Sequence, residues 1–193
     1  MPYNLAYPIH AVFNNPRLRK ILVKIRYPIF LLLFILSIPH IKPSLFFHGL
    51  LVSLFGESIQ LWCFGSLEKN RTLSTKGPYL VTRNPMYLGR FFLILGFLLL
   101  FGNLWVILAF VFVYYFYMVN RVKREEKSLS ALFGADYDIY CREANRFCPS
   151  LKKFDWKSFW FFRWRLFLKN HGHWNLGLFV AGYILLYLFA FKI

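Results

Sequence analysis

Gly77-Pro78-Tyr79-Leu80-Val81-Thr82-Arg83-Asn84-Pro85-Met86-Tyr87-Leu88-Gly89 is the stretch that decides how this chain is interpreted. It places turn-forming and polar residues between two apolar segments of a very hydrophobic sequence, and Glu125-Glu126 follow about forty residues later. Polar clusters at a membrane boundary are costly to desolvate, so they usually serve a ligand or a mechanism. We therefore expect this stretch to form a ligand site at the end of a membrane-spanning helix.

The composition is that of a small membrane protein. Of 193 residues, 58% are hydrophobic and 22% aromatic, and the mean hydropathy is +0.45. A soluble domain of this size does not need so much apolar surface. The net charge of +16 could indicate nucleic acid, but the basic residues lie between apolar segments and no nucleic-acid-binding motif is present. We predict an all-α polytopic membrane protein that forms a single domain over residues 1–193.

The apolar segments predict about five transmembrane helices. They cover residues 21–39, 44–65, 88–101, 104–119 and 174–191. The third and fourth should form a hairpin that turns at Gly102-Asn103. The third is shorter than the roughly twenty residues of a full crossing, so the hairpin could be tilted or partly re-entrant. No small-residue cleavage site closes the first apolar segment, and we expect no cleavable signal peptide.

The basic residues are distributed very unevenly between the predicted loops. Segments 1–26, 66–90 and 121–170 hold five, five and twelve of the 24 Lys and Arg residues, and only Lys42 and Lys192 lie elsewhere. Cytoplasmic loops carry an excess of Lys and Arg. The N-terminus and the polar loops are therefore predicted to be cytoplasmic, and the C-terminus is predicted to lie on the opposite side.

Residues 77–89 have the pattern of a turn followed by a helix start. Gly77-Pro78 is a turn signal, Pro85 suits a first helical turn, and Asn84 is a plausible cap. The free N–H groups of such a helix start favour a carboxylate or phosphate. Gly89 would let a ligand or a neighbouring helix approach closely. The alternative is a capped helix that enters the membrane with Arg83 and Tyr79 as interface anchors.

Carboxylates mark two further places in the chain. Glu125 could pair with Arg121 on a solvated helix end, but this would leave Glu126 unexplained. Glu57 shares one helical face with Ser53, Gln60 and Phe64 inside the second predicted span. An intramembrane carboxylate indicates a functional site or a buried partner. Glu57 could face the reacting groups, or it could snorkel or pair with a basic residue such as Arg90.

The cysteines and histidines give little support for a metal centre. Cys63, Cys141 and Cys148 are widely spaced, form no CxxC pair, and are expected to be reduced and unpaired. His171 and His173 lie two residues apart at the start of the last span. A metal pair is possible there, but interfacial polar residues at a helix start are more common. We predict no metal site.

The chain resembles the isoprenylcysteine carboxyl methyltransferase and phospholipid methyltransferase superfamily of membrane enzymes. The shared pattern is Gly-x-Tyr, Arg-His-Pro-x-Tyr-x-Gly, a helix hairpin, Glu-Glu, and Phe-Gly-x-x-Tyr-x-x-Tyr ending near Arg-x-x-Pro. Here these elements are Gly77/Tyr79, Arg83-Asn84-Pro85-Met86-Tyr87-Leu88-Gly89, Glu125-Glu126, Phe133-Gly134-Ala135-Asp136-Tyr137-Asp138-Ile139-Tyr140 and Arg146-Phe147-Cys148-Pro149. The resemblance covers residues 56–149, about half of the chain. The tail, residues 155–193, lies outside it.

The resemblance implies an S-adenosylmethionine-dependent methyltransferase whose cytoplasmic cofactor pocket is built from helices and loops. It implies cofactor binding by Gly77, Tyr79, Arg83, Asn84, Pro85, Tyr87, Gly89, Glu125 and Glu126. Glu57 and Arg146 are the candidate catalytic residues. The partners would be the bilayer and a lipophilic acceptor: a prenylated cysteine, a phospholipid amine, or another isoprenoid or lipid.

Asn84 departs from the family pattern, which commonly has His at this position. Asn can form hydrogen bonds or cap a helix, but it cannot titrate near neutral pH. Two rival interpretations stay open, and Asn84 supports the second of them. One is a related NADPH-dependent membrane lipid or sterol reductase. The other is a lipid-binding membrane scaffold that has lost catalysis.

Overall fold

The structure is a computed structural model that describes residues 7–68 and 72–192. Across these ranges the only β pairing is an isolated bridge between Thr82 and Asn145. The helices are α1 (Tyr7–Asn14), α2 (Pro16–Ser37), α3 (Phe46–Ser66), α4 (Pro85–Leu99), α5 (Leu104–Phe133), α6 (Ala135–Glu143), α7 (Trp156–Phe159), α8 (Trp164–Lys169) and α9 (Gly172–Phe191). Short 3-10 turns are η1 (Ile38–His40), η2 (Pro43–Leu45) and η3 (Gly77–Leu80). The predicted all-α class is confirmed.

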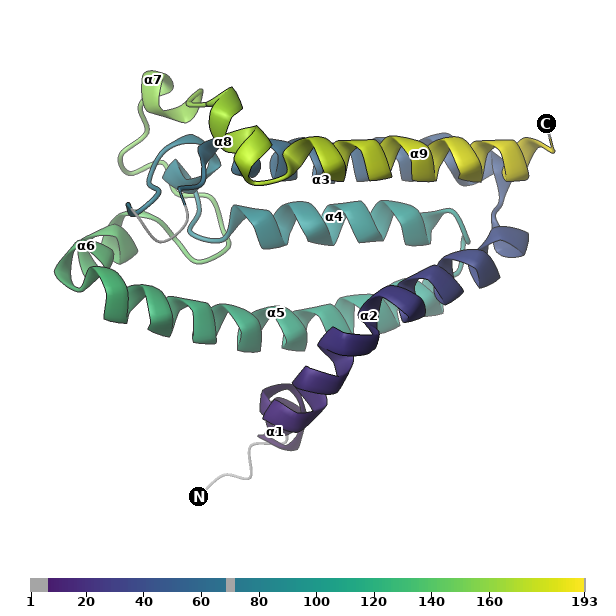
Figure 1. The fold of residues 1–193 in the computed structure, drawn as a ribbon, viewed down its shortest axis with the longest axis horizontal. Helices are drawn as coiled ribbons and strands as arrows, with labels where there is room; N and C mark the ends of the chain where they lie inside the picture. The colour runs from purple at the N-terminus through teal and green to yellow at the C-terminus, as the bar shows by residue number, and fades with distance from the viewer. Residues whose placement is uncertain (1–6, 69–71, 193) are drawn as a thin grey trace.

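The long helices lie roughly along one direction (Figure 1). α9 packs beside α3, α4 lies against α3, and α5 follows on the other side of α4. The short helices α6, α7 and α8 gather at one end of this bundle, together with the loop that carries η3. The C-terminus lies at the other end. We call the first of these the loop end and the second the turn end, after the α4–α5 turn located there.

Within the described part of the chain, three helices are long and apolar enough to cross a membrane: Pro43–Ser66, Leu104–Phe133 and Gly172–Phe191. A fourth crossing is possible through α2, whose parts Pro16–Ile29 and Leu31–His40 are bent by 43°. α4 has 15 residues, about 22 Å of helix against a hydrocarbon core of about 30 Å. The described residues thus support an integral membrane protein, whereas the predicted count of five spans is not confirmed.

The α4–α5 hairpin turns where the sequence predicted. Gly102 has φ +55, and the side chain of Asn103 accepts hydrogen bonds from the N–H groups of Trp105 (3.0 Å) and Val106 (3.3 Å). An Asn in this position satisfies two of the unpaired donors at a helix start. α5 then continues to Phe133, well beyond residue 119, so its second half carries Glu125 and Glu126 out of the membrane-spanning part.

Close approach of backbones joins α3 to α4. A Cβ atom added at Gly56 would lie 2.3 Å from the Leu93 nitrogen and 2.5 Å from the Gly89 carbonyl oxygen. Ser53 reinforces the contact because its hydroxyl donates to the Leu93 carbonyl at 2.8 Å. Small residues on facing helices are the usual means of such packing in membranes. α3 and α4 therefore pack closely together, and this contact fixes the position of the start of α4 at the loop end.

Gly56→Ala should lower the free energy of unfolding by about 1–3 kcal/mol, because the methyl group forces two backbones apart. Gly182→Ala on α9 is the matched control, since nothing lies within 4 Å of a Cβ added there. A helix-interior alanine in open space should be neutral or slightly stabilising. Thermal unfolding of both variants in detergent measures the difference, and equal unfolding temperatures would contradict this account of the α3–α4 contact.

The N-terminal helix α1 packs on α5 at Asn120 and Arg124, just before Glu125 and Glu126. The side chains of His10 and Asn14 both hydrogen-bond to the buried amide of Asn120, and Arg124 donates to Asn14. At the turn end, Lys42 contacts the Gly102 carbonyl. Of the basic residues in the predicted loops, Lys69 and Arg71 lie outside the described residues. The side of the membrane that each end faces stays a prediction.

Candidate functional site

The η3 turn holds Gly77 and Tyr79 firmly in place. Gly77 has φ +64, and an added Cβ would lie 2.3 Å from the Ser66 hydroxyl, so a larger residue would be strained and would clash. The hydroxyl of Tyr140, on α6, donates to the Tyr79 carbonyl at 2.6 Å. Burial raises the pKa of Tyr140 above its ordinary value, so this donor stays protonated at neutral pH. Both tyrosines therefore anchor the turn.

Residues 81–84 pair with residues 145–150, which follow α6. The Arg83 N–H donates to the Asn145 carbonyl (2.9 Å), and the Ser150 N–H donates to the Val81 carbonyl (2.7 Å). The Asn84 side chain donates to the Arg146 carbonyl at 3.2 Å. Asn84 does precede Pro85 at the start of α4, but its side chain makes no capping hydrogen bond. Asn84 is thus the N-cap residue of α4, as predicted, but its side-chain amide is engaged across the loop instead of at the helix start.

Arg83, Glu126 and Arg146 meet in one ion cluster. Arg83 Nη2 lies 3.3 Å from Glu126 Oε1. Arg146 binds both carboxylate oxygens, through Nη2 to Oε2 and through Nε to Oε1 at 3.1 Å. The Glu126 side chain is 11% exposed and that of Arg83 13%. Hydrogen bonding to the carboxylate raises the pKa of Arg146 above its ordinary value. Two guanidinium groups face one carboxylate, so by formal charge the cluster has one positive charge in excess.

The ion cluster has unused capacity for a ligand. The Nε atom of Arg83 is buried and has no hydrogen-bond partner among the described residues. Buried donors without partners are rare in folded proteins. α4 begins at Pro85 beside this guanidinium, and the start of a helix favours an anion. An excess positive charge, an unused donor and a helix start together suit a carboxylate.

Tyr87 links α4 to the exposed Glu125. The Tyr87 hydroxyl donates to Glu125 Oε2 at 2.6 Å and accepts from Arg121 Nε at 3.2 Å. The predicted direct pair between Arg121 and Glu125 is therefore wrong, since the two charges meet through the tyrosine oxygen. Tyr114 donates to the Tyr87 carbonyl at 2.6 Å and ties the same turn to α5.

Gly89 lies on the face of α4 that packs on α3. An added Cβ would lie 2.8 Å from the Gly56 carbonyl oxygen and 2.9 Å from Gln60 Cγ. Gly89 was expected to admit either a ligand or a neighbouring helix. In the structure the neighbouring helix α3 occupies the space that a side chain would need. The part of Gly89 in the site is to bring α4 close enough to α3 to hold Pro85 and Tyr87 in position.

Glu57 is 1% exposed and is bound by a residue from the far end of the chain. The side-chain amide of Asn175, on α9, donates to Glu57 Oε1 at 2.8 Å and to Oε2 at 2.9 Å. Among the described residues no basic side chain pairs with Glu57, so the suggested partner Arg90 is wrong. No hydrogen bond in the described part of the chain joins Glu57 to the ion cluster. Sequence reasoning missed Asn175, although it is the one amide in the last apolar segment.

Residues 161–170, which precede α9, pack against the C-terminal end of α3. The Phe161 carbonyl accepts from Trp62 Nε1 (3.2 Å) and from the Ser66 hydroxyl (2.9 Å), and it lies 3.2 Å from a Cβ added at Gly77. Asn170 donates to the carbonyls of Phe64 and Leu67 at 2.9 and 2.8 Å. This segment therefore joins α9 to the η3 turn.

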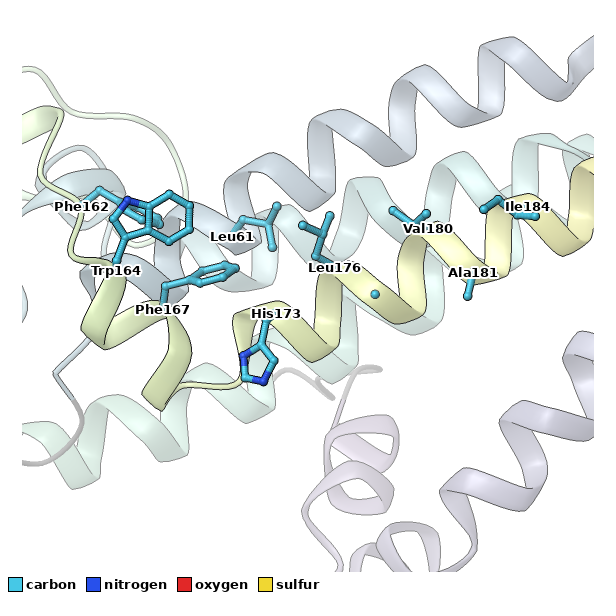
Figure 2. A pocket seen from close by; sticks show the side chains of 10 residues that line it. Leu61, Phe162, Trp164, Phe167, His173, Leu176, Val180, Ala181 and Ile184 are labelled. Atoms are coloured by element: carbon cyan, nitrogen blue, oxygen red, sulfur yellow. The ribbon is translucent and has the colours of Figure 1, made fainter.

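An apolar groove of about 560 Å³ lies next to that segment. Figure 2 shows Phe162, Trp164 and Phe167 at one end and aliphatic side chains of α9 along the rest. Leu61 of α3 contributes to the wall, and His173 is the only ionisable lining residue. Grooves of about 300–1,000 Å³ commonly accept small molecules. Phe162 directly follows Phe161, so the groove begins beside the residues that contact the η3 turn.

The three cysteines form no disulfide in the described part of the chain. Cys63 is buried in α3, Cys141 is partly buried, Cys148 is exposed, and all are free. The rings of His171 and His173 have their centroids 6.4 Å apart. Over residues 7–68 and 72–192, no group of three or more His, Cys, Asp or Glu residues could hold a metal ion.

Comparison with known proteins gives one family match and two curated relatives. A family model described as phospholipid methyltransferase matches residues 47–136, which include Gly77 to Glu126 and end before Arg146. The cobalt-zinc-cadmium resistance protein CzcN of Cupriavidus metallidurans is 31% identical over 147 residues, 73% of this chain and 67% of that protein. The protein-S-isoprenylcysteine O-methyltransferase of Schizosaccharomyces pombe is 28% identical over 127 residues.

The second match covers 63% of this chain and 54% of the yeast protein, so the chain spans only about half of that relative. No solved structure matches the chain significantly.

Proposed function

The chain belongs to the isoprenylcysteine carboxyl methyltransferase and phospholipid methyltransferase superfamily, and from that premise we propose that it transfers a methyl group from S-adenosylmethionine to a lipophilic acceptor. The observation that carries the proposal is the ion cluster of Arg83, Glu126 and Arg146. These residues come from three separate motif elements of the sequence and meet at the start of α4. A purely structural pair would not need the third charge or the unused Arg83 donor.

The residues around the ion cluster fit the polar part of the methyl donor. The carboxylate of its methionine moiety would be held by Arg83, by Arg146 and by the start of α4. The exposed carboxylate of Glu125, fixed by Tyr87, would accept from its ribose hydroxyls or its ammonium group. When bound, the donor supplies an electrophilic methyl group on a sulfonium. Methyl transfer also requires that donor and acceptor are aligned in a site from which water is excluded. The packed η3 turn and α4 would provide this alignment.

The apolar groove fits the non-reacting part of the acceptor. Its lining is aromatic at the end next to the η3 turn and aliphatic along α9, as a prenyl or acyl chain requires. A chain that lies in this groove would enter from the bilayer, because α9 is largely exposed on its outer faces. An acceptor carboxylate needs no base, whereas an acceptor amine must lose a proton. Glu57 is our candidate base for the second case only.

Calorimetric titration of the detergent-purified chain with S-adenosylmethionine, S-adenosylhomocysteine and NADPH tests the proposal. We expect the first two to bind and NADPH not to bind. Binding of NADPH alone would favour the membrane reductase instead. A folded chain that binds none of the three would favour the inactive scaffold, and Asn84→His would then test whether the family residue restores binding. Acceptor screening with prenylcysteine and phosphatidylethanolamine would follow a positive result.

A further inference from the structure

A second and larger cavity lies at the turn end of the bundle, away from the ion cluster. Its volume is about 980 Å³, and it is lined by the second half of α2, the second half of α4 and the start of α5. Pro85 and the ion cluster are at the opposite end of α4. This turn-end cavity is therefore separate from the candidate methyl-transfer site, and a ligand could occupy it whether or not the chain transfers methyl groups.

The turn-end cavity is apolar along its length and polar at one end. Leu33 and Phe34 of α2 and Phe97 and Leu98 of α4 form its walls. At the polar end the lining contains Ser37, His40, Lys42 and Asn103. This division between an apolar body and a polar end matches an amphiphile rather than a compact polar ligand.

Two of the four polar residues are already engaged within the protein. The Ser37 hydroxyl donates to the Phe34 carbonyl at 2.6 Å, and the Asn103 side chain caps α5. The Lys42 ammonium has only a long contact of 3.5 Å with the Gly102 carbonyl, while its backbone N–H is fixed to the Leu100 carbonyl at 2.8 Å. Lys42 thus has a fixed backbone and an available cationic head at the mouth of the cavity.

The sequence supplies no carboxylate for this cation. Residues 1–56 and 69–124 contain neither Asp nor Glu, and these ranges include every residue that lines the cavity. His40 is the only other ionisable lining residue, and it cannot neutralise Lys42. A cation at a membrane boundary without a protein counter-ion favours an anionic lipid headgroup. Charge and shape therefore indicate the same class of ligand.

We propose that the turn-end cavity binds an anionic phospholipid. One acyl chain lies along the cavity walls that α2 and α4 form, beside the rings of Phe34 and Phe97, which stack on each other with their centroids 6.2 Å apart. The phosphate is paired with Lys42. The bound chain adds apolar contacts with α2 and α4 to those of this aromatic pair, so the lipid also strengthens the attachment of α2 to the bundle.

Native mass spectrometry of the full chain in detergent, with added phosphatidylglycerol or phosphatidylcholine of identical acyl chains, tests this site. We expect phosphatidylglycerol to be retained about fivefold more strongly, which is the effect of one favourable Lys contact. Lys42→Gln should remove that preference and Lys42→Arg should keep it. Lys192→Gln, at the other basic residue near this end, is the matched control and should leave retention unchanged. Leu98→Trp fills the cavity and should lower retention of both lipids.

Three results would overturn the proposal: equal retention of the two lipids by the unaltered chain, an unchanged preference in Lys42→Gln, or an equal loss in Lys42→Gln and Lys192→Gln. The third would mean attraction to surface charge in general rather than to this cavity. If Lys42→Gln does not fold, Leu98→Trp tests whether the lipid binds in the turn-end cavity. Undiminished retention of both lipids by that variant would show that the lipid binds elsewhere.

Discussion

Glu126→Gln should abolish binding of S-adenosylmethionine, with a loss of affinity of at least about 30-fold. Glu126 neutralises one of two guanidinium groups in a largely buried cluster and holds both in place through three contacts. The amide keeps the size of the side chain but leaves Arg83 and Arg146 to repel each other and to lose their alignment. The side chain of Arg146 is 42% exposed, so the loss of stability should be smaller than for a fully buried pair, about 1–3 kcal/mol. Titration calorimetry and thermal unfolding separate the two effects.

Glu143→Gln is the matched control for Glu126→Gln. Glu143 also pairs with a cation, Lys153, but that ammonium side chain is 67% exposed. Exposed ion pairs contribute about 0–1 kcal/mol, so this variant should bind and unfold like the unaltered chain. Arg83→Lys adds a second test at the ion cluster, because it keeps the charge and removes the unused Nε donor. A folded Glu126→Gln chain with undiminished binding would remove the ion cluster from the cofactor site.

The local features of this fold could be predicted from sequence, because short-range chemistry determines them. Pro85 begins α4, and Gly102-Asn103 makes the hairpin turn, since a proline, a glycine and a capping asparagine act on their immediate neighbours. The family motif also identified Arg83 and Glu126 as members of one site. Their contact then follows from α4 and α5 being adjacent in the hairpin.

The hydrogen-bond partners of the polar side chains could not be predicted in the same way. Asn84 reaches a carbonyl 62 residues away, and Glu57 reaches an amide 118 residues away. Helix and strand periodicities relate residues only a few positions apart, so no sequence pattern could reveal contacts over these separations. Asn175 lies in a segment outside the family resemblance, and its only signal was an amide within an apolar helix. In a membrane such an amide must find a partner.

Asn175→Leu should lower the free energy of unfolding by about 1–3 kcal/mol, because it leaves the buried Glu57 carboxyl group without its hydrogen-bond donor. Glu57→Leu combined with Asn175→Leu should recover most of that loss, since replacing both partners of a buried polar pair by apolar groups is often nearly neutral. Thermal unfolding of the single and double variants forms a double-mutant cycle that measures the coupling. Additive losses would contradict the pairing of α3 with α9 through these two side chains.

Glu57→Gln distinguishes a catalytic carboxylate from a purely structural one. An amide at this position can still exchange hydrogen bonds with Asn175, so we expect the variant to fold and to bind S-adenosylmethionine. If Glu57 takes the proton from an amine acceptor, turnover of that acceptor should fall by about 100-fold or more, and its pH dependence should change. Turnover of a carboxylate acceptor needs no base and should be unaffected. Undiminished turnover of both acceptors would leave Glu57 with one role, which is to fasten α9 to α3 beside the apolar groove.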